Sequence, residues 1–305
     1  MMRVLRAQSA GFCLGVSLAL KRLDQELAAF QQEANASPEN RLQEGNSRHG
    51  GRLITFGPII HNPLVMRHYA SLGVLCDDDP SGMAQGDRVV IRAHGIPRSV
   101  ENALRESGAS IVDATCPKVK KAQTAIARVH GKGGTLLLFG EKDHPEVRGL
   151  LSYAGEGAHV FGDMRELEAL DLDGRTSYFL AAQTTQERSL FHQAAQYLRE
   201  RLGHDVKTLD TICDATRDRQ QEVIDLCGQV RAMVVVGGLN SGNTRRLAEV
   251  ARAQGVPTIH VEQVSDVTEE MNRTILRGAA VSGLTAGAST PQQHIDDMQQ
   301  YLEQL

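Results

Sequence analysis

The sequence predicts an α/β protein made of three related domains, with mostly parallel sheets around a pseudo-threefold axis. Apolar strand-like segments alternate with helical patterns along the 305 residues. A cysteine follows such a segment at three comparable places, and polar residues recur at comparable strand ends. Alternating strands and helices favour parallel sheets covered by helices. We therefore expect domains at 1–112, 113–209 and 210–305.

The first repeated element carries a cysteine. Cys13, Cys116 and Cys213 each follow an apolar segment and precede a helical pattern, and they are spaced at roughly 100 residues. Ligands of parallel sheets bind beyond the carboxyl ends of the strands. If the three domains surround one axis, the three thiols meet at one point.

The second repeated element is an apolar strand that ends in glycine. A polar residue follows each glycine four positions later, and these residues are His61, His144 and Ser241. A helical pattern begins directly after each of them. The free N–H groups and the dipole of a helix N-terminus favour a bound anion, so these positions are candidate anion contacts.

The third repeated element is an apolar strand that ends in small polar residues. His94 marks this place in the first domain, Thr184 in the second and Ser289 in the third. With Asn243 and the residues of the second element, they form a ring of uncharged or weakly basic groups. The pattern indicates a phosphate or diphosphate held without a lysine or arginine clamp.

Two segments lie outside the repeat. The stretch at about 33–52 is polar and rich in Gly, Asn and Ser, which predicts an inserted mobile loop. Beyond Pro291, the residues Ile295, Met298 and Leu302 recur at helical spacing. They predict a final helix that closes the third domain.

Three thiols without a matching fourth cysteine indicate a metal site with one free position. Zinc would need a fourth ligand, such as a histidine. A [4Fe–4S] cluster also takes cysteine ligands and can leave its fourth iron open. Structural zinc usually uses closely spaced cysteine pairs, which this sequence lacks, so the cluster is favoured. Glu146 is either an ordinary first-turn acid or a proton relay.

Composition and charge weigh against several function classes. Lys and Arg number 33 against 37 Asp and Glu, and aromatic residues make up only 4% with no Trp, a poor composition for nucleic-acid binding. No run of eighteen apolar residues predicts a membrane span. The start lacks the pattern of a secretory signal. We expect a cytoplasmic enzyme that binds neither nucleic acid nor membrane.

The words GFCLGV, IHNPLV, AHGI, DATCP, HPEVRG, QTT, NSGNTRRLAE and TAGAST, in this order, resemble the 4-hydroxy-3-methylbut-2-enyl diphosphate reductase family of LytB type. The resemblance runs from Gly11 to about Pro291. It implies a three-domain fold around an oxygen-sensitive [4Fe–4S] cluster. It also implies reductive dehydroxylation of an allylic diphosphate to isopentenyl and dimethylallyl diphosphates, with two electrons from a ferredoxin or flavodoxin.

The resemblance also implies residue roles. Cys13, Cys116 and Cys213 would be the three cluster ligands, with one iron left open. Glu146 would deliver protons, and Thr184 would help this relay near the hydroxyl. The diphosphate would be held by His61, His94, His144, Ser241, Asn243 and Ser289.

Departures from the family pattern leave alternatives open. Gly242 replaces a second serine and Leu239 a common lysine, so a paralogue acting on a related hydroxylated substrate fits as well. Other readings are a quinolinate-synthase-like or diphthamide-synthesis-like reaction, or a non-enzymatic iron–sulfur sensor. Lys118, Lys120 and Lys121 could face an acidic redox partner, but a solvated helix face is the favoured interpretation.

Overall fold

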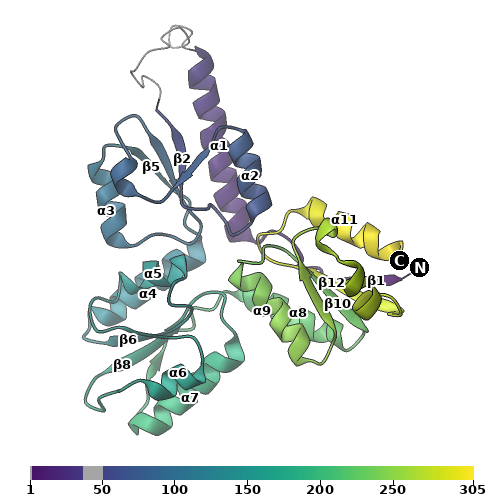
Figure 1. Cartoon of the computed structure of the whole chain (residues 1–305). Coiled ribbons are helices and arrows are strands. Elements are labelled where there is room, and N and C mark those ends of the chain that lie inside the picture. Colours follow the sequence, from purple (N-terminus) through teal and green to yellow (C-terminus); the bar gives the residue numbers. More distant parts are fainter. Residues whose placement is uncertain (1, 37–50) are drawn as a thin grey trace.

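The computed structural model describes residues 2–36 and 51–305, whose strands form three sheets of four strands each. The strand pairings of these residues are parallel. Three units of sheet and helices meet at a common centre (Figure 1). The predicted three-part α/β architecture is therefore confirmed.

The first unit follows Cys13 and has the strand order β3-β2-β4-β5. Its elements are α1 (Leu14–Ala36), β2 (Leu53–Phe56), α2 (Pro63–Ser71), β3 (Leu75–Asp77), β4 (Arg88–Ile91), α3 (Arg98–Glu106) and β5 (Ser110–Asp113), with a 3₁₀ turn at Pro80–Gly82. Asn62 caps α2, because its side chain accepts hydrogen bonds from the backbone N–H groups of Leu64 and Val65. This cap fixes the end of the His61 loop.

The second unit follows Cys116 and has the strand order β7-β6-β8-β9. Its elements are α4 (Pro117–His130), β6 (Thr135–Phe139), α5 (Pro145–Leu151), β7 (His159–Phe161), α6 (Met164–Ala169), β8 (Tyr178–Ala182), α7 (Arg188–Leu202) and β9 (Lys207–Thr208). The central strands β6 and β8 are almost fully buried. Helices cover both faces of a parallel sheet, so such strands are continuous apolar runs.

The third unit follows Cys213 and has the strand order β1-β12-β10-β11. Its elements are α8 (Asp214–Cys227), β10 (Ala232–Val236), α9 (Gly242–Ala253), β11 (Thr258–Val261), α10 (Glu269–Met271), β12 (Val281–Ala286) and α11 (Gln292–Glu303). A 3₁₀ turn at Val264–Asp266 and a π-helical turn at Asn272–Leu276 complete it, together with β1 (Arg3–Arg6) from the start of the chain.

The three sheets have the same cyclic topology. In each sheet, one edge strand leads along the chain to a cysteine. These edge strands are β5, β9 and β1, and they pair with β4, β8 and β12 respectively. For the third unit this strand is β1, which pairs with β12 in the register Arg3 opposite Val281. The predicted range 1–112 placed these residues in the first domain, and the pairing corrects that placement. The ranges 113–209 and 210–305 stay predictions as domain limits.

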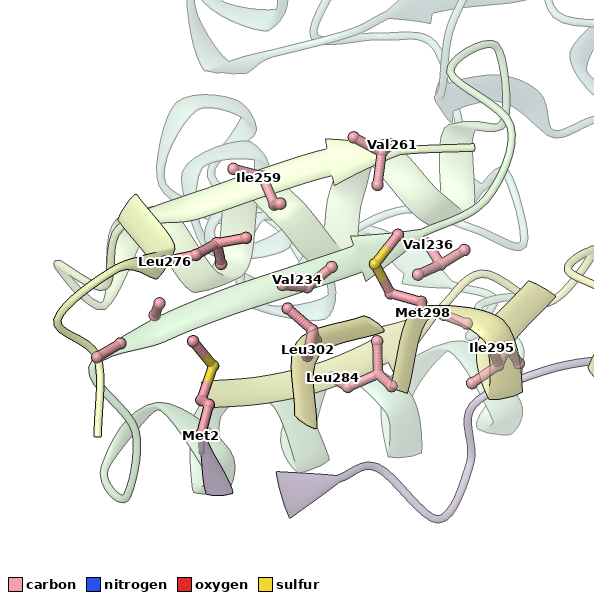
Figure 2. Close-up of a cluster of buried hydrophobic side chains, with 13 residues drawn as sticks. Met2, Val234, Val236, Ile259, Val261, Leu276, Leu284, Ile295, Met298 and Leu302 are labelled. Atoms are coloured by element: carbon pink, nitrogen blue, oxygen red, sulfur yellow. The ribbon is translucent and has the colours of Figure 1, made fainter. Parts of the chain in front are cut away.

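The predicted final helix is confirmed as α11. Ile295, Met298 and Leu302 are fully buried and pack over the third sheet (Figure 2). They contact apolar side chains of the central strands, such as Val234 and Leu284. Met2, just before β1, joins the same core, which is why the start of the chain is held in this unit.

The predicted insertion at about 33–52 is partly helix. Helix α1 continues to Ala36, since glutamate, glutamine and alanine are good helix formers. Glu33 also pairs with Arg88, with 3.0 Å between a carboxylate oxygen and Nη2. Residues 37–50 lie outside the described residues. Among the residues described, no helix is both long enough and apolar enough to cross a bilayer.

Candidate active site

One pocket lies where the three units meet, and all eleven residues singled out in the sequence line it. These are Cys13, His61, His94, Cys116, His144, Glu146, Thr184, Cys213, Ser241, Asn243 and Ser289. Each unit contributes to the set, from the ends of strands and the starts of helices. The structure thus brings the predicted residues together, while the role of each remains a prediction.

The three cysteines occupy equivalent positions. Each directly precedes a helix, α1, α4 or α8. Each also donates its backbone N–H to a carbonyl at the end of the third repeated element: Cys13 to Ala288 at 3.1 Å, Cys116 to Ala93 at 2.9 Å, and Cys213 to Thr184 at 2.9 Å. A thiol at a helix N-terminus lies in a positive field that favours its thiolate, the form that binds metals.

Gly15 allows the close approach of α1 to the second cysteine. A Cβ at this position would lie 2.4 Å from the Sγ of Cys116 and 3.9 Å from the Sγ of Cys13. Burial raises the pKa of the Cys116 thiol, and the neighbouring Cys13 and Cys213 thiols raise it further. The three sulfur atoms therefore share one small volume.

The spacing of the three cysteine sulfurs bears on which metal group they could hold. Zinc–sulfur bonds of about 2.3 Å in a tetrahedral site place the sulfur atoms about 3.8 Å apart. Among the described residues, the three cysteine sulfurs do not all lie within 4.8 Å of one another, whereas nitrogen atoms of three histidines do. A cluster of several irons spans a wider gap between thiolates. Cys76 and Cys227 lie outside this pocket.

Three half-buried histidines form the neighbouring wall. The ring centroids of His61 and His94 are 4.2 Å apart, and that of His144 lies 5.2 and 5.5 Å from them. Burial lowers all three pKa values, that of His144 to about 4 and that of His94 well below its ordinary value. The three rings are therefore neutral at pH 7, and each can donate one N–H.

Several nitrogen atoms of this wall are free to bind a ligand. The Nδ1 of His144 accepts the backbone N–H of Glu146 at 3.1 Å, so the ring proton is on Nε2. Within the described part of the chain, His61 Nε2, His94 Nδ1 and Asn243 Nδ2 are buried without a hydrogen-bond partner. Buried polar atoms normally have partners, so these three point to a polar ligand.

The two serines lie at the junction of the first and third units. Ser289 donates its hydroxyl to the carbonyl of His61 at 3.2 Å, and the side-chain amide of Asn62 donates to the carbonyl of Ser289 at 2.8 Å. Ser241 caps α9 by accepting the N–H of Thr244. Both serines line the pocket that the three histidines also line.

Glu146 and Thr184 form a buried pair. One carboxylate oxygen accepts the backbone N–H of Thr184 at 2.6 Å and the other accepts its hydroxyl at 2.8 Å. Glu146 is only 2% exposed, and burial raises its pKa to about 7 although both hydrogen bonds oppose this shift. A carboxyl group with such a pKa can hold and donate a proton at neutral pH.

Comparison with known proteins decides the family. The family model described as LytB protein matches residues 4–303. The chain belongs to the LytB family. A 4-hydroxy-3-methylbut-2-enyl diphosphate reductase of Nitratidesulfovibrio vulgaris (strain DSM 19637 / Miyazaki F) is 58% identical over 304 residues and is covered completely, as is this chain. The enzyme of the same name from Oleidesulfovibrio alaskensis is 54% identical over 304 residues, again with complete coverage of both chains.

Solved structures agree with this assignment. The structure described as (E)-4-hydroxy-3-methyl-but-2-enyl diphosphate reductase, the terminal enzyme of the non-mevalonate pathway, has a TM-score of 0.66 and 34% identity, with full coverage of both chains. The Plasmodium falciparum E-1-hydroxy-2-methyl-but-2-enyl-4-diphosphate reductase has a TM-score of 0.85 at 23% identity, over 98% of this chain and 87% of that one, which supports the fold. The LytB fold resemblance is thereby confirmed.

Some residues at this LytB site had no role in the sequence interpretation. Arg219 lines the pocket from α8, the helix that follows Cys213. Arg245 of the third unit forms an ion pair with Glu141 of the second unit. The Nη2 of Arg245 donates to both carboxylate oxygens of Glu141 at 2.7 Å. Lys118, a candidate contact for a redox partner, also lines this pocket and pairs with Asp214 at 2.6 Å.

The lysines after Cys116 form ion pairs within the chain. Lys118 bridges α4 to α8, and the Nζ of Lys120 lies 2.6 Å from a carboxylate oxygen of Asp113. These pairs agree with the simpler reading of a solvated helix face. A redox partner at this surface remains a prediction.

Proposed function

We propose that this chain is a 4-hydroxy-3-methylbut-2-enyl diphosphate reductase. The observation that carries the proposal is a single pocket that joins three cysteines, three half-buried neutral histidines and a buried carboxyl group whose pKa is about 7. The overall reaction removes the allylic hydroxyl as water. Two electrons and two protons are consumed, and isopentenyl or dimethylallyl diphosphate is formed.

The three cysteines are the proposed ligands of a [4Fe–4S] cluster with one open iron. All three line one pocket, and each directly precedes a helix, whose N-terminal dipole favours an anionic group. When bound, such a cluster supplies electrons and a Lewis-acidic position for the substrate hydroxyl. A ferredoxin or flavodoxin is the proposed electron donor.

The diphosphate is proposed to occupy the histidine side of the pocket. Neutral N–H donors and a helix N-terminus bind an anion without the desolvation cost of burying an extra charge. His61, His94 and Asn243 each offer a buried nitrogen atom that has no partner in the described protein. The proposed contacts are His61, His94, His144, Ser241, Asn243 and Ser289.

Glu146 is the proposed proton donor, with Thr184 as its positioning partner. The two hydrogen bonds from Thr184 hold both carboxylate oxygens, so the carboxyl group has one orientation toward the pocket. Its pKa of about 7 keeps a substantial protonated fraction at neutral pH.

Gly242→Ser is expected to strengthen substrate binding. A Cβ at this position would meet Glu141 Oε1 at 3.5 Å and Thr185 Oγ1 at 3.7 Å, both ordinary contacts, so a serine fits without strain. The added hydroxyl would lie at the start of α9, beside Ser241. One hydrogen bond to the diphosphate is worth about 1 kcal/mol, which lowers KM by roughly fivefold. Steady-state kinetics would measure this change, with Gly242→Ala as the control that adds a carbon but no donor.

The proposed function is tested by anaerobic oxidation of reduced methyl viologen, using protein whose iron and sulfide have been quantified. Adding 4-hydroxy-3-methylbut-2-enyl diphosphate is expected to start rapid oxidation, and the same alcohol without its diphosphate is not. If cluster-loaded protein oxidises no viologen with this substrate, the reductase proposal fails. Activity with another hydroxylated diphosphate would then indicate a paralogue, and none with any would favour a sensor.

A further inference from the structure

Arg219 is a buried cation whose partners are both backbone carbonyls. Its side chain projects from α8 and the residue is 5% exposed. Nη1 donates to the carbonyl of Ala215 at 3.1 Å and Nη2 to the carbonyl of Gly11 at 2.8 Å. Its Nε is buried and has no partner within the described residues.

No anion of the described chain neutralises this guanidinium directly. The nearby carboxylates are engaged elsewhere: Glu222 accepts from Ser9, and Asp218 pairs with Arg217. Burial of a charge without a counter-charge is costly, so such a group normally has an anionic partner. The burial of the Arg219 guanidinium would therefore be stabilised by a negative group bound in the pocket, because no carboxylate of the described residues forms an ion pair with it.

The cysteine site is where that negative group would lie. Arg219 lines the same pocket as the three cysteines. Burial lowers the pKa of its guanidinium, and the strongest opposing influences are the Cys13 and Cys213 thiols. Among the described residues that line this pocket, Lys118 is the one lysine or arginine besides Arg219. Lys118 is half exposed and is already paired with Asp214.

We propose that Arg219 is the buried counter-cation of the group held by Cys13, Cys116 and Cys213, and that it raises the reduction potential of that group. The inference rests on the proposed function, because it takes that group to be an iron–sulfur cluster. Three thiolates make the bound cluster anionic, and each added electron makes it more so. A fixed positive charge in a water-poor pocket therefore stabilises the reduced form more than the oxidised form.

Arg219 also links two elements that present cluster ligands. Gly11 precedes Cys13, and α8 begins directly after Cys213. The hydrogen bond to the Gly11 carbonyl therefore holds two of the three cysteine segments together. A purely structural clamp would affect cluster retention without changing the potential, so the two roles can be separated.

The test is an anaerobic redox titration of reconstituted protein, followed by electron paramagnetic resonance. Arg219→Met is expected to lower the ratio of reduced to oxidised cluster at a fixed potential by about tenfold or more, which is about 59 mV for a one-electron couple. Arg219→Lys keeps the charge and should stay within about threefold of the parent protein. The matched control is Arg217→Met, which removes an exposed charge from the same helix and should also stay within about threefold.

Each outcome of the titration either supports or overturns the proposed role of Arg219. Equal potentials in the parent protein and Arg219→Met would overturn the proposal, as would equal shifts in the Met and Lys variants. If Arg219→Met folds but takes up no iron while Arg219→Lys does, the charge requirement is supported. Loss of cluster from both variants would make Arg219 only a clamp. If the parent protein holds a cluster but shows no turnover, the proposed reaction is refuted and the titration still tests the role of Arg219. If the parent protein binds no cluster, the proposed reaction and the proposed role of Arg219 are both refuted.

Discussion

Replacement of Cys116 by serine is expected to abolish turnover and most cluster binding. The sulfur of Cys116 lies beside α1, at the second of three equivalent positions around the pocket. Serine keeps the size of the side chain but is a poor ligand for iron in a cluster. Iron should fall from about four per chain to well under one after anaerobic reconstitution. Iron and sulfide assays with the viologen assay would measure both losses.

Cys76→Ser is the matched control for this variant. Cys76 is exposed in β3 and does not line the pocket, so its replacement should leave iron content and turnover unchanged. Full activity and full iron content in Cys116→Ser would remove this residue from the metal site. A zinc content of one per chain without sulfide in the parent protein would point instead to the zinc alternative.

The second large effect is expected from Glu146→Gln. The amide preserves the shape of the side chain and can still accept the N–H of Thr184, but it has no acidic proton to transfer. General acid–base catalysis contributes about 10²- to 10⁴-fold, so kcat should fall by that range while iron content stays normal. Unchanged kcat would exclude Glu146 as the proton donor.

The pH dependence gives an independent measure of the same group. Burial raises the pKa of Glu146 to about 7, so its protonated form dominates below that pH and is lost above it. Turnover limited by this proton should therefore fall about tenfold per pH unit on the alkaline side. Glu146→Gln should lack this limb. Thr184→Val, which removes one hydrogen bond to the carboxylate, should shift the limb to higher pH, because that bond favours the charged form.

The sequence was sufficient to predict the threefold repeat and the gathering of the site residues. The reason is physical: parallel strands present their carboxyl ends on one edge, so strand-end residues from three repeats face one centre. Cys13, Cys116 and Cys213 confirm this logic through equivalent backbone hydrogen bonds at their own amides. The order of the motifs along the chain, together with this geometry, is sufficient to predict the site residues.

Other features of the fold and the site could not be predicted, because the local sequence pattern does not encode them. The outer strands β3, β7 and β11 are only three or four residues long, so they show little periodicity. The pairing of β1 with β12 joins segments almost a whole chain apart, and no local pattern encodes it. The burial of Arg219 was equally invisible, because it depends on a hydrogen bond to the carbonyl of Gly11 more than two hundred residues away.

The most direct test of the central claim is the ratio of electrons consumed to product formed. Cluster-loaded protein would be mixed anaerobically with reduced methyl viologen and limiting 4-hydroxy-3-methylbut-2-enyl diphosphate, and the diphosphate products would be quantified by mass spectrometry. We expect two viologen radicals to be oxidised for each molecule of isopentenyl or dimethylallyl diphosphate. Product without electron consumption, or electron consumption without these products, would contradict a reductive dehydroxylation at this site.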